Sequence, residues 1–399
     1  MLTYLTSGES HGPQLTAIVD GFPAGLSLDL DFIDHELARR QKGYGRSGRM
    51  EIESDHVQIV SGVRGGVTLG GPITLVIPNK DWENWSRIMH PIDQIPDDLT
   101  DREQRLVCDT TRPRPGHADL PGGIKWNHRD LRNVLERASA RETAARVAIG
   151  AVARRFLQHF SVYFASHVVR IGEAALPENY KRPDVATIRE ITEVSPVRCL
   201  DSATEKAMVE QIKAAGQDSD SLGGIAELII TGLPAGLGGC SQWADRLDGK
   251  LAGALMAIHS VKGVQIGLGF EAARRRGSDV HDEIFLDEDR HTPRKGFRRD
   301  TNNAGGIEGG ITNGEDIVIQ VASKPISTLN RPLRTVDVVK HEPATAMVER
   351  TDVCVTPALA VITEAVAALV LVEVFMYKFG HDNMAEIDRN YQGFLSAEY

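Results

Sequence analysis

The sequence lacks several features that would assign a protein quickly to a functional class. Its 4 cysteines, Cys108, Cys199, Cys240 and Cys354, are scattered with no close pair, which excludes a zinc knuckle and a disulfide framework. We therefore expect reduced thiols and no metal site. The formal net charge of -10 argues against a general nucleic-acid binder, because such proteins neutralise phosphates with surplus Lys and Arg.

Leader and membrane signals are also missing. Residues 1–5 carry no charged leader followed by an apolar run, so we predict no secretory signal and a cytoplasmic location. The segment 357–377 is rich in Ala, Val and Leu, but Glu364 and Glu373 interrupt it, whereas a spanning helix needs about 20 nearly uncharged residues. We therefore expect a buried or subunit-facing helix and no membrane partner.

Sequence motifs for nucleotide binding are absent, and the one motif for a catalytic nucleophile has weak support. No GxGxxG follows a strand into a helix and no Walker loop is present, so a Rossmann crevice has no support. Gly8-Glu9-Ser10-His11-Gly12 matches the spacing of a serine-hydrolase elbow. That elbow needs a strand–turn–helix context, whereas Pro13 and a predicted strand at 15–19 follow here, which disfavours the hydrolase interpretation.

The hydrophobic pattern predicts a mixed α/β fold. The apolar fraction of 41% and the charged fraction of 25% are typical of a globular protein. Short apolar runs predict strands, and longer periodic segments predict helices. The expected strands are 56–60, 73–77, 226–230 and 316–320, and the expected helices are 127–160, 245–258 and 358–377. We expect one domain, 1–399, with long insertion loops at 81–105 and 269–303.

A basic, glycine-broken segment at 39–49 is the first functional signal. It holds Arg39, Arg40, Lys42, Arg46 and Arg49. One interpretation is a solvated flexible loop. The other is a loop that binds phosphate or carboxylate, because glycine lets the backbone approach a ligand and guanidinium groups donate in forked pairs.

Two further basic clusters follow. In 112–119 prolines stiffen a loop that presents Arg114 and His117, and the histidine is open to two interpretations, a general acid or a turn cap. Within the predicted helix 127–160, Arg137 and Arg141 are four residues apart and so share a face. Salt bridges with neighbouring glutamates and close approach of a flat ligand both fit that pattern.

Three ordered segments carry a family resemblance: Gly8 to Gly12, the run ERASARETAARVAIG at 136–150, and ERTDVC at 349–354. They resemble the signatures of the chorismate synthase family, and 114–119, 302–306 and 324–328 match its pattern as well. The resemblance covers nearly the whole chain. One departure is His259-Ser260, where many relatives carry Asn-Ala.

The resemblance implies a fold, a reaction and partners. The fold is a single α/β domain with a β-α-β sandwich core, usually a homotetramer. The reaction is the 1,4-anti elimination of phosphate from 5-enolpyruvylshikimate 3-phosphate to give chorismate, which needs reduced FMN without net redox change. Because no Rossmann fingerprint is present, we expect an external flavin reductase, with NADPH as an indirect electron source.

The resemblance also implies roles for individual residues. The catalytic set comprises His11, His117 and Asp352, with one histidine protonating the departing phosphate and the other the flavin. The substrate-binding set comprises Ser10, Arg40, Arg46, Arg49, Arg114, Arg141 and Arg350. The cofactor-binding set comprises Arg137, Ala138, Ser139, His259, Ser260, Gly309, Gly310, Lys324, Pro325, Ile326, Ser327, Thr328 and Arg350.

Overall fold

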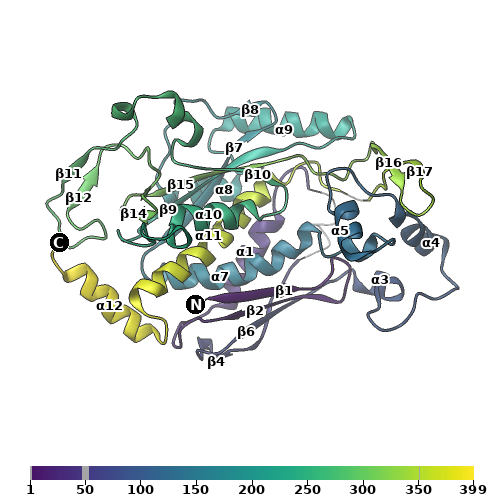
Figure 1. Cartoon of the computed structure of the whole chain (residues 1–399), viewed down its shortest axis with the longest axis horizontal. Coiled ribbons are helices and arrows are strands. Elements are labelled where there is room, and N and C mark those ends of the chain that lie inside the picture. Colours follow the sequence, from purple (N-terminus) through teal and green to yellow (C-terminus); the bar gives the residue numbers. More distant parts are fainter. Residues whose placement is uncertain (1, 47–53, 350) are drawn as a thin grey trace.

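Two antiparallel sheets enclose a layer of helices in the computed structural model, which describes residues 2–46, 54–349 and 351–399 (Figure 1). The central helices are α1 (Leu30–Gln41), α7 (Thr143–His159) and α11 (Thr356–Phe379). Helix α7 packs on the smaller sheet, and α11 packs on the larger one. The predicted mixed α/β class is confirmed.

The smaller sheet has the order β1-β2-β6-β3. Its strands are β1 (Thr3–Ser7), β2 (Gln14–Asp20), β3 (Gln58–Ser61) and β6 (Ile73–Pro78). Strand β2 buries Leu15, Ala17 and Val19 against the helices and turns Gln14 and Ile18 outward. This alternation is the period-two pattern of a strand with one buried face.

The larger sheet has the order β10-β15-β9-β7-β8. Its strands are β7 (Tyr163–Ile171), β8 (Ala174–Ala175), β9 (Gly224–Thr231), β10 (Val261–Ile266) and β15 (Ile317–Ser323). In the register, Leu228 of β9 lies opposite Ser166 of β7 and Ile319 of β15. The sheet therefore joins segments far apart in sequence into one surface under α11.

Helix α11 is a core helix. By length and composition it could cross a membrane, yet 89% of its apolar window is buried inside the fold. Close helix contact needs a residue without a side chain in α7, because a Cβ on Gly150 would lie 2.4 Å from the Cβ of Ala365. The prediction of a buried helix at 357–377 is confirmed.

A buried ion cluster explains the glutamate in this apolar helix. Glu364 is fully buried and lies 2.8 Å from both Arg39 and Arg154. Burial by itself would raise the pKa of Glu364, but the two guanidinium groups outweigh it and hold the pKa well below its usual range. The cluster ties α1, α7 and α11 together. The basic segment 39–49, expected to be a loop, begins inside α1, because Arg39 and Arg40 lie buried in the last turn of this helix.

The prediction of one long helix at 127–160 is wrong for the N-terminal half of that range. Asn127 caps α5 (Asp119–Trp126) in the left-handed conformation, and only α6 (Arg132–Leu135) and a 3₁₀ turn, η2 (Ala140–Glu142), precede α7. Ser139 is extended, with ψ 143°, and its Oγ accepts a hydrogen bond from the Arg141 backbone N–H. This local capping competes with the helix and breaks it.

The remaining elements lie around this core. The helices are α3 (Trp82–Met89), α4 (Asp101–Cys108), α8 (Val185–Val194), α9 (Ser202–Gln217), α10 (Leu247–Met256) and α12 (Met384–Ser396). Small hairpins are formed by β4 (Val63–Arg64) with β5 (Val67–Thr68), β11 (Ile284–Leu286) with β12 (Phe297–Arg299), β13 (Ile307–Glu308) with β14 (Ile311–Thr312), and β16 (Arg334–Asp337) with β17 (Glu342–Thr345). Segment 81–105 thus contains helical structure, and 269–303 contains a hairpin.

Candidate active site

The turn that joins β1 to β2 carries the first predicted site residues. Gly8 has a φ of 109°, and a Cβ there would lie 2.4 Å from the carbonyl oxygen of Gln14, so the turn requires glycine. Asn79 donates to the carbonyl oxygens of Glu9 and Gly12 at 3.2 and 2.8 Å. The Ser10 N–H donates to the carbonyl oxygen of Glu136 at 3.1 Å. The turn is therefore docked on the segment after α6.

His11 pairs with a buried carboxylate. Its Nδ1 lies 3.0 Å from Glu136 Oε1, and its backbone N–H donates to Glu136 Oε2 at 2.8 Å. Arg132 donates to the same carboxylate at 2.8 Å, and the imidazole stacks on Trp85 with ring centroids 4.0 Å apart. Burial by itself would raise the pKa of Glu136, but the hydrogen bond from His11 and the charge of Arg132 lower it.

His117 has a matching partner at the start of α5. Its Nδ1 lies 2.5 Å from Oδ1 of the fully buried Asp119, and Arg114 donates to Asp119 Oδ2 at 2.9 Å. Burial by itself would raise the pKa of Asp119, but hydrogen bonds from His117 and Arg114 hold it well below its usual range. Arg114 also donates to Thr328 Oγ1 at 2.9 Å.

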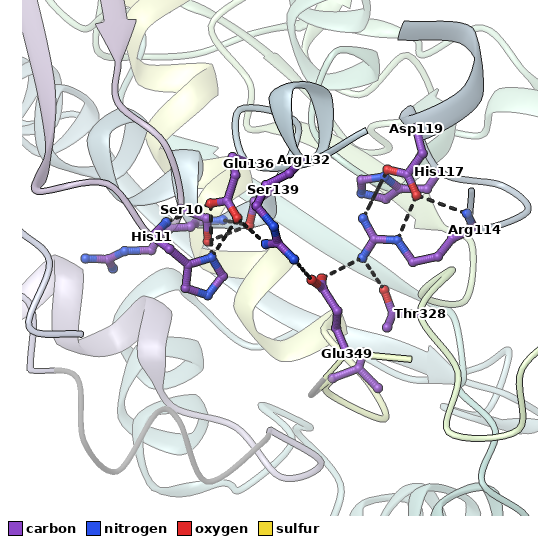
Figure 2. A network of polar contacts seen from close by, with 12 residues as sticks. Ser10, His11, Arg114, His117, Asp119, Arg132, Glu136, Ser139, Thr328 and Glu349 are labelled. Carbon is purple, nitrogen blue, oxygen red and sulfur yellow. Dashed lines mark hydrogen bonds and ion pairs between the residues drawn. The ribbon is translucent and has the colours of Figure 1, made fainter. Parts of the chain in front are cut away.

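A third carboxylate joins the two histidine sites. Glu349 accepts from Arg132 at 3.3 Å through Oε1 and from Arg114 at 3.2 Å through Oε2. Figure 2 shows Glu349 between the two guanidinium groups, with His11 on one side and His117 on the other. The two predicted acids thus belong to one polar network.

The predicted substrate residues Arg40 and Arg141 form a neighbouring cluster. Arg141 donates to Asp55 at 2.7 Å and to Asn79 at 3.0 Å, and Arg40 donates to Thr143 Oγ1 at 2.9 Å. Burial by itself would raise the pKa of Asp55, but the hydrogen bond and charge of Arg141 lower it. Asn79 also holds the 8–12 turn, so this cluster is rigidly connected to Ser10 and His11.

The break before α7 separates two arginines that a continuous helix would align. Arg141 is buried and points to Asp55, whereas Arg137 has a 40% exposed side chain and donates to the Thr6 carbonyl oxygen at 2.7 Å. The prediction that they share a helix face is therefore wrong.

The other predicted anion-binding residues fall partly outside the described chain. Arg46 Nε lies 3.3 Å from Asp352 Oδ2, and the Val353 N–H donates to the Gly45 carbonyl oxygen at 2.7 Å. The basic segment and the C-terminal signature are thus neighbours in space. Arg49 and Arg350 lie outside the described residues.

The predicted cofactor residues divide between the two histidine sites, with Lys324 beside the His117 loop and Ser139 beside Ser10. Lys324 donates through Nζ to the Gly116 carbonyl oxygen at 2.5 Å and through its backbone to the Ser260 carbonyl oxygen at 2.9 Å. Ser139 donates to Ser10 Oγ at 3.1 Å. Burial lowers the pKa of His259, and the charge of Glu142 opposes this only in part.

Two buried nitrogens in this region fit a polar ligand. His259 Nδ1 and Arg137 Nη1 are buried and have no hydrogen-bond partner among the described residues. Buried polar atoms are usually satisfied, so unpaired ones need an explanation such as a missing ligand. A flavin ring or phosphate has the acceptors and donors to satisfy them. Both nitrogens are therefore compatible with a flavin as the ligand.

Gly309 and Gly310 lie elsewhere in the chain. They connect β13 to β14, and the Gly310 carbonyl oxygen accepts from the Leu247 N–H at 2.9 Å. Figure 1 places β14 toward the opposite end of the molecule from α5 and the start of α7. One chain does not bring these glycines together with the other predicted cofactor residues.

Several site residues were not predicted from the sequence: Asp55, Asn79, Asp119, Arg132, Glu136 and Glu349. Asp119, Glu136 and Glu349 lie within the segments that carry the family resemblance, and the spacing of His117 and Asp119 also indicated a pair. Asp55 and Asn79 had none, because only tertiary contact brings them to Arg141. Within the described ranges, no group of three or more His, Cys, Asp and Glu side chains could hold a metal ion.

The fold is α/β, and buried guanidinium groups converge on two imidazole–carboxylate pairs, an arrangement typical of enzyme sites for anionic substrates. The comparisons with known proteins make the class specific. A family model described as chorismate synthase matches residues 2–376.

Known relatives agree over the full length. Chorismate synthase of Geotalea daltonii is 53% identical over 99% of this chain and 98% of its own, and that of Desulforudis audaxviator is 53% identical over 99% and 97%. A solved structure titled chorismate synthase superposes with a TM-score of 0.77 at 40% identity, covering 99% of this chain and 97% of its own. The chain belongs to the chorismate synthase family, and with it to the carbon–oxygen lyases of the shikimate pathway to aromatic amino acids.

Proposed function

We propose that this site converts 5-enolpyruvylshikimate 3-phosphate to chorismate by 1,4-anti elimination of phosphate, with reduced FMN bound beside the substrate. The observation that carries the proposal is the joining of two imidazole–carboxylate pairs by Arg132, Glu349 and Arg114 in one buried network. A substrate with a phosphate and two carboxylates requires such a concentration of guanidinium donors. Reduced FMN, when bound, supplies electron density for the elimination without net redox change.

The substrate groups are Ser10, Arg40, Arg46, Arg49, Arg114, Arg141 and Arg350. Their task is to neutralise the polyanion and fix its orientation. Buried carboxylates hold Arg141 and Arg114 in place before substrate arrives, through Asp55 and Asp119 respectively. This preorganisation means that little reorganisation accompanies the chemical step.

The two histidines take different partners in this proposal. His11 lies in the turn with Ser10, which Asn79 connects to Arg141, so we assign it to the departing phosphate. His117 follows Gly116, whose carbonyl oxygen binds Lys324, so we assign it to the flavin side. Asp352, paired with Arg46, would accept or relay the proton lost from carbon 6 at the flavin.

The flavin-binding set is Arg137 to Ser139, His259, Ser260, Gly309, Gly310, Lys324 to Thr328 and Arg350. The unpaired nitrogens of His259 and Arg137 support it. Since Gly309 and Gly310 are remote in one chain, a site that uses the whole set needs two chains. That requirement supports an oligomer, and we propose the homotetramer of single-domain β-α-β sandwich subunits that the family resemblance implies.

The cellular setting completes the proposal. We place the protein in the cytoplasm, without nucleic-acid or membrane partners. We infer that an external flavin reductase supplies reduced FMN and that NADPH is the indirect electron source.

An anaerobic assay tests the function directly. Purified protein with reduced FMN and 5-enolpyruvylshikimate 3-phosphate should release phosphate and form chorismate in equal amounts. Omitting the flavin should stop both. Phosphate release that continues without flavin would contradict the proposal, and chorismate formation from NADPH without a reductase would contradict the external electron source.

A further inference from the structure

Glu349 differs from the other two carboxylates in the network. Arg132 has its own buried partner in Glu136 at 2.8 Å, and Arg114 has its own in Asp119 at 2.9 Å. Glu349 touches both arginines at 3.3 and 3.2 Å. Its side chain is 24% exposed, whereas those of Glu136 and Asp119 are 1% and 0% exposed. The shared carboxylate is the one with the longest contacts and the readiest access to water.

These differences make Glu349 the exchangeable partner. Charge-assisted hydrogen bonds are strongest near 2.8 Å and weaken as they lengthen. A carboxylate that already reaches solvent recovers its hydration on leaving, whereas Glu136 and Asp119 would have to be exposed first. Each arginine also keeps its own counter-charge when Glu349 leaves, so neither becomes an unpaired buried cation.

The position that Glu349 occupies suits an external oxyanion. Two guanidinium groups converge on its two oxygens, one on each, and a phosphate or carboxylate group presents oxygens at similar spacing. The same position lies between the imidazole–carboxylate pairs of His11 and His117 (Figure 2). An anion held there would contact both halves of the site.

We propose that Arg132 and Arg114 form an oxyanion site that Glu349 fills in the free protein and that an anionic group of the substrate takes over by displacing Glu349. Arg132 is thereby a further substrate-binding residue. The identity of the displacing group as part of 5-enolpyruvylshikimate 3-phosphate rests on the proposed function. The oxyanion site itself rests only on the contacts among these side chains.

Titration calorimetry with inorganic phosphate tests the site without turnover. Glu349→Gln in the full chain should lower the Kd for phosphate about tenfold, because an internal competitor for charge-assisted contacts is removed. The matched control is Glu342→Gln, which removes an equal charge from a 58% exposed side chain in β17 and should leave the Kd unchanged. Acetate in place of phosphate shows whether the site prefers a phosphate or a carboxylate group.

A second variant separates a specific site from a general change in charge. Arg132→Lys keeps the charge but loses the forked donors, so adding it to Glu349→Gln should remove most of the gain. Equal phosphate affinity in wild type and Glu349→Gln would overturn the inference, as would a gain that persists undiminished in the double variant. If Glu349→Gln fails to fold, Glu349→Asp replaces it. The shorter side chain cannot span both arginines, so this variant protein should bind phosphate severalfold tighter than wild type.

Turnover distinguishes the two proposals. If the wild type forms chorismate, Glu349→Gln should lower KM for the substrate. An unchanged KM together with an unchanged phosphate Kd would reject the displacement and leave the function standing. If the wild type forms no chorismate but phosphate binding responds as expected, the oxyanion site stands and the proposed function fails.

Discussion

The two histidine sites contain the same groups but are assembled differently. His117 and its carboxylate are 2 residues apart, where a proline-stiffened loop enters α5, whereas His11 and Glu136 are 125 residues apart. The first pair is encoded locally. The second exists only when the 8–12 turn docks on the segment after α6. The two imidazole–carboxylate pairs should therefore respond differently to the same kind of substitution, because one forms within a short segment and the other only through tertiary contact.

Removing the imidazoles should have the largest effect. His11→Ala and His117→Ala should each lower kcat by about 10²–10⁴-fold, because each removes a proposed proton donor. If the two roles differ as assigned, His117→Ala should leave the KM for substrate close to that of wild type. Steady-state kinetics with reduced FMN in excess measure both constants. A KM that rises in proportion to the loss of kcat would make His117 a binding residue instead.

Neutralising the carboxylate partner of each histidine should distinguish the locally formed pair from the pair that depends on tertiary contact. Asp119→Asn and Glu136→Gln each leave buried cations short of a counter-charge, so each should lower the free energy of unfolding by about 3–5 kcal/mol. Urea unfolding measures this loss. Glu136→Gln should also loosen the 8–12 turn and increase amide exchange there, whereas Asp119→Asn should not. Equal exchange of that turn in the two variants would contradict the contrast between tertiary and local encoding.

Low pH should lower the contribution of both histidine sites to the free energy of unfolding. The folded pKa values of Asp119, Glu136 and Asp55 are lowered, while in the unfolded chain they are about 4. Groups with depressed folded pKa values stabilise the fold above their unfolded pKa and lose that contribution as the pH falls through the folded pKa. The free energy of unfolding should thus fall progressively as the pH drops below about 5. Urea midpoints between pH 3 and 6 measure it, and Asp119→Asn should flatten the slope.

How far the sequence predicted this molecule follows the same division between local and tertiary encoding. Alternating and periodic apolar patterns predicted β6 and α11, because each buries a face or a whole surface in one core. The spacing of His117 and Arg114 within one loop marked a site. The break at Ser139 was missed, since an apolar helical pattern continues through a residue whose hydroxyl caps η2.

The segment 81–105 shows what periodicity could not predict. It was expected to be an insertion loop, yet α3 places Trp85 under His11 and Arg132. Charges and prolines around the short helix hid its apolar face, which faces the site. No pattern within the segment identifies its partner, because the contact is defined by the docked 8–12 turn.

The smallest effect tests that contact. Trp85→Leu keeps an apolar side chain but removes the ring that stacks on His11 at 4.0 Å and lies 5.1 Å from the Arg132 guanidinium. The free energy of unfolding should fall by about 2 kcal/mol, because the substitution removes buried ring volume together with one aromatic and one cation–π contact, and kcat should fall only a few-fold. Trp126→Leu is the control, since that side chain is 56% exposed on α5 and should change neither quantity. A loss in Trp85→Leu as large as that of His11→Ala would show that the tertiary site depends on this support far more than its contacts indicate.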